Sequence, residues 1–346
     1  MRKLILMMIL AVSLSFPAAA LEVDPPEVPD FGEEYMPEDT ESFSEGLWYV
    51  IKAGIKNFLP ELHDASKACV TIIAITILVS FLNQFPGTTN SVIHLVSAII
   101  IGITLLQPAS TLIRLGVETV TEMTEYGKLL LPVMTGILAA QGGVTTAGAL
   151  FTTTTFFSTL LSTLIVNIIV PMLYVYFCLC LVDGAVGDNL IGSLKKFLKW
   201  LITWSLKTVL YIFSGFIGIT GVVSGTADAS AIKAVKLTIS GAVPVVGGVI
   251  SEASETILVS AGIMKNAAGI YGILAILAVF VGPFLKIGVQ YLLLKITTGI
   301  CGIMDNKREC ALLGDFSVGM GMLLGMTGTV CLLLLISTVC FMKGVS

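Results

Sequence analysis

Charged residues are scarce in this sequence. Asp, Glu, Lys and Arg make up 12% of the 346 residues, whereas 55% are hydrophobic and the mean hydropathy is +0.97. Soluble globular proteins carry roughly 25% charged residues, so a large soluble domain is excluded. The length allows about seven membrane-spanning helices of ~20 residues with their connections. We therefore predict an all-α polytopic membrane protein with about seven spanning helices, in a range of roughly 6–8.

Motifs of enzyme chemistry are lacking as well. The sequence contains no Walker phosphate-binding loop, no HExxH and no GxSxG. Its two histidines, His63 and His94, do not belong to a set of ligands with metal-binding spacing. We therefore predict no catalytic residues, no cofactor, no metal site and no nucleic-acid partner. Any transport would have to be driven by a gradient or by a separate ATPase.

The N-terminus has the three-part pattern of a secretory signal peptide. Arg2 and Lys3 precede an apolar stretch at 4–16, and three alanines at 18–20 form a small-residue cleavage site. We predict a signal peptide at 1–20 that is cleaved after Ala20. The alternative is an uncleaved anchor helix. In either case residue 21 begins outside the cytoplasm.

Lys and Arg are absent from the stretch that follows. Residues 21–46 contain ten acidic residues and four prolines. Such a segment cannot bury enough apolar surface to offset its chain entropy, so we predict an acidic disordered extracytoplasmic arm. It serves either as a solvated spacer or as an arm that binds a basic partner.

The rest of the chain is mildly basic, with 17 Lys and Arg against 13 Asp and Glu from residue 47 onward. We predict an amphipathic lead-in at 47–67 and a polytopic helical membrane domain at 68–346. Basic residues next to spanning helices favour the cytoplasmic side of the membrane. Two clusters therefore predict cytoplasmic loops, namely Lys195, Lys196 and Lys199 within 183–200, and Lys307 with Arg308.

Two stretches in the middle of the chain leave alternatives open. Residues 110–128 combine a charged face with an apolar face, which predicts an amphipathic helix. This helix lies on the membrane or a partner, or packs on the protein's own body. The apolar stretch at 129–182 predicts two or three helices, because it is interrupted at Pro132, Gln141–Gly143 and Pro171.

Ionisable residues within apolar runs are candidate functional residues, because a charge at membrane depth is costly and usually faces protein or water. Asp315 and Lys286 are the main candidates for intramembrane charges, and Lys207 and Lys295 lie in similar runs. In one interpretation they line a solute pathway. In the other, the lysines extend their amines toward the membrane surface and Asp315 lies at the start of a helix.

A broken apolar run stands out near the middle of the body. The stretch KLTISGAVPVVGGVISEASET at 236–256 holds an apolar run that is too short to cross a bilayer as one helix, which needs ~20 residues. It predicts a re-entrant helical hairpin whose tip, 243–248, lines the centre of a complex. The alternative is two amphipathic surface helices joined at a flexible turn. The residues of this predicted conduit segment are Lys233, Lys236, Gly241, Pro244, Gly247, Gly248, Glu252 and Glu255.

Charge spacing supports the hairpin. Pro244 lies midway between Lys236 and Glu252, and also midway between Lys233 and Glu255. A chain folded at Pro244 would set each lysine level with a glutamate. Proline cannot donate a backbone hydrogen bond and suits a break between two half-helices. The three glycines suit a turn with backbone angles that other residues resist.

The stretch AIKAVKLTISGAVPVVGGVISEASETILVSAGIMKNAAGIYG at 231–272 resembles the most recognisable part of the stage III sporulation protein AE family of endospore-forming bacteria. The Pro-Val-Val-Gly core at 244–247 carries the resemblance, together with Glu252, Glu255-Thr256 and Lys265-Asn266. The resemblance extends over 47–346. The chain departs from the family pattern at Gly248, where a family member has a basic residue.

The resemblance implies a non-catalytic channel or scaffold subunit of the conduit or secretion complex that joins mother cell and forespore during endospore development. The implied partners are ring-forming subunits and an ATPase from the same stage III sporulation operon, a forespore-side partner and membrane lipid. The implied location is the mother-cell membrane around the forespore, with several passes and an extracytoplasmic mature N-terminus. The residues alone also allow a stand-alone, gradient-driven small-molecule permease, although the acidic arm and the amphipathic 110–128 favour the first function.

Reversing one charge tests the predicted hairpin. We expect Lys236→Glu to lower the sporulation frequency, because two carboxylates would then face each other at the base of the hairpin. Adding Glu252→Lys should restore part of the loss. Counts of heat-resistant spores measure both effects. A harmless Lys236→Glu, or a double variant no better than the single one, would contradict the paired hairpin.

Overall fold

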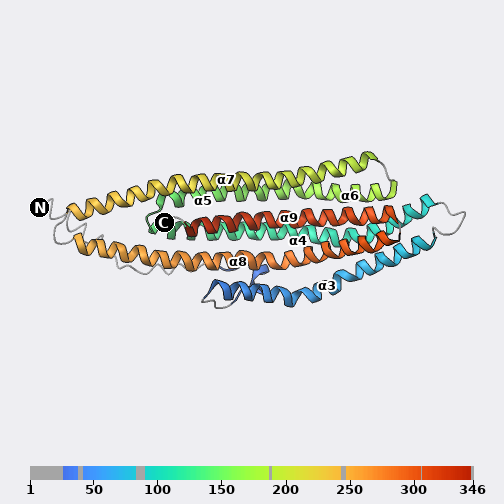
Figure 1. Cartoon of the computed structure of the whole chain (residues 1–346), viewed down its shortest axis with the longest axis horizontal. Helices are drawn as coiled ribbons and strands as arrows, with labels where there is room; N and C mark the ends of the chain where they lie inside the picture. The colour runs from blue at the N-terminus through green and yellow to red at the C-terminus, as the bar shows by residue number, and fades with distance from the viewer. Residues whose placement is uncertain are drawn as a thin grey trace.

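A computed structural model describes residues 26–37, 42–82, 90–186, 189–242, 247–304 and 306–343. At 59, 61, 64, 90–91, 189, 220–242 and 247–266 it describes the backbone alone. These residues form an antiparallel bundle of long helices without strands (Figure 1), which confirms the predicted all-α class. The elements are α2 Asp30–Glu33, α3 Phe43–Leu82, α4 Asn90–Ala140, α5 Val144–Leu164, the π-helical η1 Ile165–Ile169, α6 Val170–Val186, α7 Asn189–Ala242, α8 Gly247–Ile303 and α9 Lys307–Lys343.

Within the described residues, six helical stretches are long and apolar enough to cross a membrane. This number lies within the predicted range and confirms a polytopic membrane protein. Helices are the expected structure, because a backbone in lipid must satisfy its hydrogen bonds within its own segment. The stretches are Ala65–Leu82, Val92–Ala140, Val144–Val186, Leu190–Ile219, Ala267–Ile303 and Lys307–Lys343.

The helices are longer than a bilayer is thick. α4 has 51 residues, α7 has 54 and α8 has 57. At ~1.5 Å per residue they extend for ~76–86 Å, more than twice the ~30 Å hydrocarbon core. On α4 the exposed large apolar side chains concentrate at 92–103, whereas Arg114 and Glu118 further along are exposed and paired at 3.7 Å. The hydrocarbon-facing belt of α4 therefore lies near its N-terminus.

That end of the bundle also carries the basic clusters, and we call it the basic end. It is formed by the C-termini of α3, α6 and α8 and the N-termini of α4, α7 and α9 (Figure 1). Lys195, Lys196 and Lys199 lie in the first turns of α7, and Lys307 and Arg308 begin α9. Both clusters are thus on helices rather than in the predicted loops. They lie at one end of the bundle, as two clusters on the same side of a membrane must, and the prediction that this side is cytoplasmic stays a prediction.

Helix α9 occupies the centre of the bundle. α4, α5, α6, α7 and α8 all pack against it, and Figure 1 shows it between α4 and α5. Its Phe316 and Phe341 are fully buried, together with Tyr176 and Phe177 of α6 and Phe213 of α7. These large aromatic side chains fill the interior with apolar contacts, which supply the main packing energy of the core.

The predicted interruptions differ from the observed ones. Pro132 lies inside α4, so the only break between α4 and α5 is at Gln141–Gly143, where Gly142 takes a φ of 91° that favours glycine. Pro171 does not break the helix either. It is the second residue of α6 and directly follows the π-helical turn η1. Its missing N–H would have bonded to the carbonyl of Asn167, which lies in η1, and a π-bulge accommodates such a gap.

Residues 110–128 form the middle of α4 and not a separate surface helix. Their apolar face is buried in the bundle, with Ile113, Val120, Met123 and Tyr126 each at most 1% exposed. This is the arrangement in which the amphipathic segment packs on the protein's own body. Likewise α3 joins the predicted lead-in at 47–67 to the predicted span that follows it in one continuous helix.

Part of the acidic arm is ordered, which corrects the expectation of a disordered segment at 26–37. α2 packs against α8, and Tyr35 is 7% exposed. Asn57 of α3 donates hydrogen bonds to Glu34 Oε1 at 2.8 Å and to Tyr35 Oη at 3.4 Å. Apolar side chains at Val28 and Phe31 supply the burial that the acidic composition conceals. Residues 1–25, with the predicted signal peptide, and 38–41 lie outside the described residues.

A close approach of α6 to α9 yields a stability prediction. A methyl group on Gly319 would lie 2.5 Å from Cε1 of Phe177, whereas one on Gly325 of the same helix meets nothing within 4 Å. We expect Gly319→Ala to cost roughly 1–3 kcal/mol through overpacking. Gly325→Ala should be neutral or stabilising by up to about 1 kcal/mol, because alanine is the better helix former.

Thermal unfolding of the two purified variants in the same detergent measures this difference. Both changes add one methyl group to one helix, so they share any general effect on helix propensity. Equal melting temperatures for the two variants would contradict the close contact between Gly319 and Phe177.

Candidate functional site: a buried charge cluster at the basic end

Three charged side chains from three helices meet near the basic end. Lys195 of α7 is 7% exposed and lies between Asp183 of α6 and Asp315 of α9. Its Nζ is 2.5 Å from Asp183 Oδ2 and donates a hydrogen bond to Asp315 Oδ2. Tyr176 Oη also donates to the backbone carbonyl of Asp315 at 3.2 Å. The cluster therefore ties α6, α7 and α9 together.

Helical periodicity explains why Lys195 points inward. Positions seven and eleven residues further along the same helix share its face, and these are Ile202 and Leu206, which are both buried. Lys196 is rotated by about 100° from this face and is exposed, whereas Lys199, one turn after Lys195, lies near the same face and is exposed at its edge. The first turns of α7 thus direct one lysine into the bundle and two toward its surface.

The charge cluster adjoins an open cavity of about 380 Å³ at the basic end. Asp183 and Asp315 line it together with Lys196, Lys307 and Arg308. One lysine held between two carboxylates leaves a formal charge of −1, which the surrounding cations offset. The two basic clusters that the sequence separates by more than a hundred residues are brought together here.

A second polar cluster ties α4 to α9. The side chain of Glu309 is fully buried, and its Oε1 lies 2.9 Å from Nδ1 of His94 and accepts a hydrogen bond of 2.5 Å from Ser97 Oγ. Among the described residues, no hydrogen-bond partner reaches Glu309 Oε2. A buried carboxylate is costly unless it is paired and hydrogen-bonded, so these contacts fix α4 against the start of α9.

A third tie joins α3 to the connection between α8 and α9. Asn306 is buried and its Nδ2 donates to the carbonyl of Thr76 at 2.9 Å, and Cys301 Sγ donates to Thr76 Oγ1 at 3.3 Å. In the part of the chain that the structure describes, no three His, Cys, Asp or Glu converge on a metal-binding position. The observed chemistry of this end is therefore ion pairing and hydrogen bonding between helices.

The predicted site residues are distributed unevenly. Asp315 belongs to the charge cluster, whereas Lys286 is exposed on α8 away from it. Sequence reasoning missed Lys195, Asp183 and Glu309 as buried groups. The helical spacing of Lys195 from Ile202 and Leu206 was the available signal, and it is lost when 183–200 is interpreted as a loop.

The predicted conduit segment lies at the opposite end. α7 ends at Ala242 and α8 begins at Gly247, while Pro244 lies outside the described residues. Figure 1 shows these two helix ends extending beyond α5 and α9. The backbone is helical at the other members of the set, but their side chains are not described, so the pairing and the re-entrant position stay predictions. These members are Lys233, Lys236, Gly241, Gly247, Gly248, Glu252 and Glu255.

The charge cluster predicts a large stability effect at one of two adjacent lysines. Lys195→Ala leaves two partly buried carboxylates without their cation, which should cost roughly 3 kcal/mol. Lys196→Ala, an equal change at an exposed neighbour, should cost less than about 0.5 kcal/mol. Melting temperatures in detergent compare the two. Equal melting temperatures for the two variants would contradict the cluster. A second test uses Lys195→Met, which removes the cation but keeps the bulk of the side chain. Adding Asp315→Asn removes one of the two uncompensated carboxylates and should recover part of the lost stability, and no recovery would also contradict the cluster.

Comparisons with known proteins agree with the sequence pattern. A family model described as stage III sporulation protein AE matches residues 33–344. A curated relative named stage III sporulation protein AE, from Bacillus subtilis strain 168, is 24% identical over 251 residues, which cover 71% of this chain and 62% of the relative. No solved structure matches. With nearly its whole length matched, the chain belongs to the stage III sporulation protein AE family.

Proposed function

We propose that this protein is a non-catalytic membrane subunit of the complex that joins mother cell and forespore during endospore development, and that it acts there as a scaffold or as one wall of a conduit. Membership of a stage III sporulation family supports the process. The six apolar helices support a location in the membrane, which we propose to be the mother-cell membrane around the forespore.

The packed interior of the bundle favours a subunit of a complex over a stand-alone permease. Tyr126, Tyr176, Phe177, Phe213 and Phe316 are each at most 2% exposed and fill the centre of the bundle. The charge cluster ties α6, α7 and α9 to one another near the basic end. A path for solute would therefore run between this chain and other subunits, along surfaces that assembly brings together.

The length of the helices gives such an assembly its contact surfaces. α4, α7 and α8 extend well beyond the thickness of a bilayer, and the ends of α7 and α8 extend beyond α5 and α9 (Figure 1). Segments that leave the membrane can reach partners in the space between two membranes. We propose ring-forming subunits, an ATPase and a forespore-side protein as these partners.

Purification from its own sporulating cells tests this function. We expect a tagged chain, extracted in mild detergent, to migrate on native gels at several times its 36.6 kDa and to bring other sporulation proteins with it. The same tag in vegetative cells is the control. A permease would instead migrate alone or as a small homo-oligomer and move a solute when reconstituted alone in vesicles. That pair of results would overturn the proposal.

A further inference from the structure

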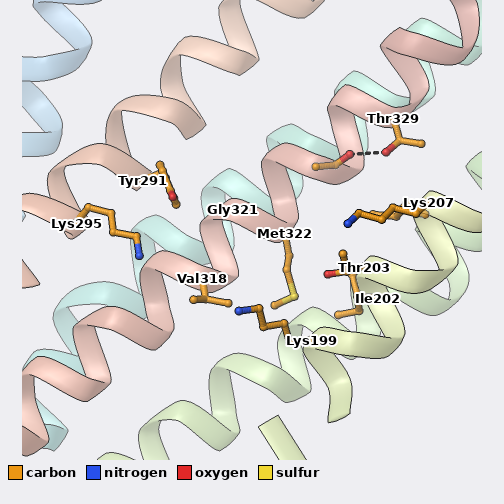
Figure 2. A pocket seen from close by; sticks show the side chains of 12 residues that line it. Lys199, Ile202, Thr203, Lys207, Tyr291, Lys295, Val318, Gly321, Met322 and Thr329 are labelled. Carbon is orange, nitrogen blue, oxygen red and sulfur yellow. Dashed lines mark hydrogen bonds between the residues drawn. The ribbon is translucent and has the colours of Figure 1, made fainter. Parts of the chain in front are cut away.

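A groove of about 400 Å³ lies between α7 and α8, with α9 as its floor (Figure 2). Lys199 and Lys207 of α7 form one side, and Lys295 of α8 forms the other. The charge cluster does not contribute to this groove, since none of its three residues lines it. The sequence had indicated Lys207 and Lys295 only as separate lysines in apolar runs.

The three lysines concentrate positive charge in one place. Figure 2 shows the amines of Lys199 and Lys295 directed toward each other across the groove, with that of Lys207 directed into it further along. All twelve residues that line the groove are described, and none is a carboxylate. Lys295 Nζ lies 5.9 Å from the ring centroid of Tyr291, which holds this cation at the wall. The alternative interpretation, in which each lysine extends separately toward the membrane surface, does not explain why all three line the same groove.

Below the amines the groove is apolar. Ile202 and Leu206 of α7 and Val318 and Met322 of α9 line it. Gly325 keeps the floor open, because a methyl group there would meet nothing within 4 Å. A cationic rim over an apolar floor matches an amphiphile that carries negative charge at one end, whereas a small hydrophilic anion would gain nothing from the floor.

Aromatic side chains place the groove near the membrane surface. Trp200 and Trp204 lie beside Lys199 on α7, are 55% and 52% exposed, and stack with ring centroids 5.8 Å apart. Exposed tryptophans favour the level of the lipid headgroups. Lys199 is also only ten residues from the start of α7 at the basic end.

We propose that this groove binds the headgroup of an anionic phospholipid, with the phosphate between Lys199 and Lys295, the positive charge of Lys207 further along the groove, and the upper acyl chains on the apolar floor. Basic pockets between membrane helices are suited to such headgroups. The site stands apart from the proposed role as a conduit subunit. At about fivefold in affinity per lysine, removing all three charges should weaken binding on the order of 100-fold.

Lipid binding to the whole purified chain tests the site. After delipidation in detergent, phosphatidylglycerol should raise the melting temperature, and native mass spectrometry should show a retained phosphatidylglycerol. Lys199→Gln/Lys207→Gln/Lys295→Gln should abolish both effects. The matched control, Lys52→Gln/Lys56→Gln/Lys128→Gln, removes the same charge from exposed lysines of α3 and α4 and should keep both. Arginine at the three groove positions should restore binding.

Blocking the groove gives a second test that leaves every lysine in place. Gly325→Leu would fill the open floor and should lower phosphatidylglycerol retention without lowering the melting temperature of the lipid-free protein. Retention that is unchanged in both the glutamine triple variant and Gly325→Leu would overturn the site. An effect of inorganic phosphate equal to that of phosphatidylglycerol, or an equal effect of phosphatidylcholine, would overturn its assignment to an anionic lipid. If the unaltered chain proved to be a dimer in detergent and Gly325→Leu separated it with lipid retention intact, the groove would be a helix-docking surface and the lipid site would be overturned.

Discussion

The close packing of five helices around α9 is the constraint on which the rest of the structure depends. A central helix in contact with α4, α5, α6, α7 and α8 needs small residues wherever a neighbour approaches closely. Gly319 meets this need against Phe177, and Gly321 and Gly325 leave the floor of the lysine groove open. The same glycine-rich helix thus closes the bundle on one side and hollows it on another.

Polar ties complement this packing near the end where α9 begins. Asp315 bonds to Lys195, Glu309 to His94 and Ser97, and Asn306 to Thr76. Apolar contacts in lipid are non-directional, and helices as apolar as these can slide along one another. A hydrogen bond between two buried groups has a defined geometry and a high cost when it is broken, so a few of them set the register of several helices. These ties lie near the basic end, where three connections between helices also lie.

The bundle has a filled interior, so binding to partners or lipids takes place on its outer surfaces. Its centre is filled by aromatic side chains, and α7 and α8 are more than twice as long as the ~30 Å hydrocarbon core is thick. Such a body suits a subunit that works by holding partners and lipids in place. The lysine groove fits this description, because a bound anionic lipid would neutralise cations that α7 and α8 direct toward each other.

The sequence by itself determined the class of protein, since few charges and long apolar runs leave no fold but membrane helices, and the motif at 244–266 indicated the family. It also indicated Asp315, because a short carboxylate in an apolar run needs a partner. Which partner it has was decided by the tertiary structure. Lys195 is 120 residues away, and its burial depends on α7 beginning at Asn189, earlier than the apolar run suggested. Convergence of Lys199, Lys207 and Lys295 likewise depends on how α7 and α8 cross α9, which local periodicity does not encode.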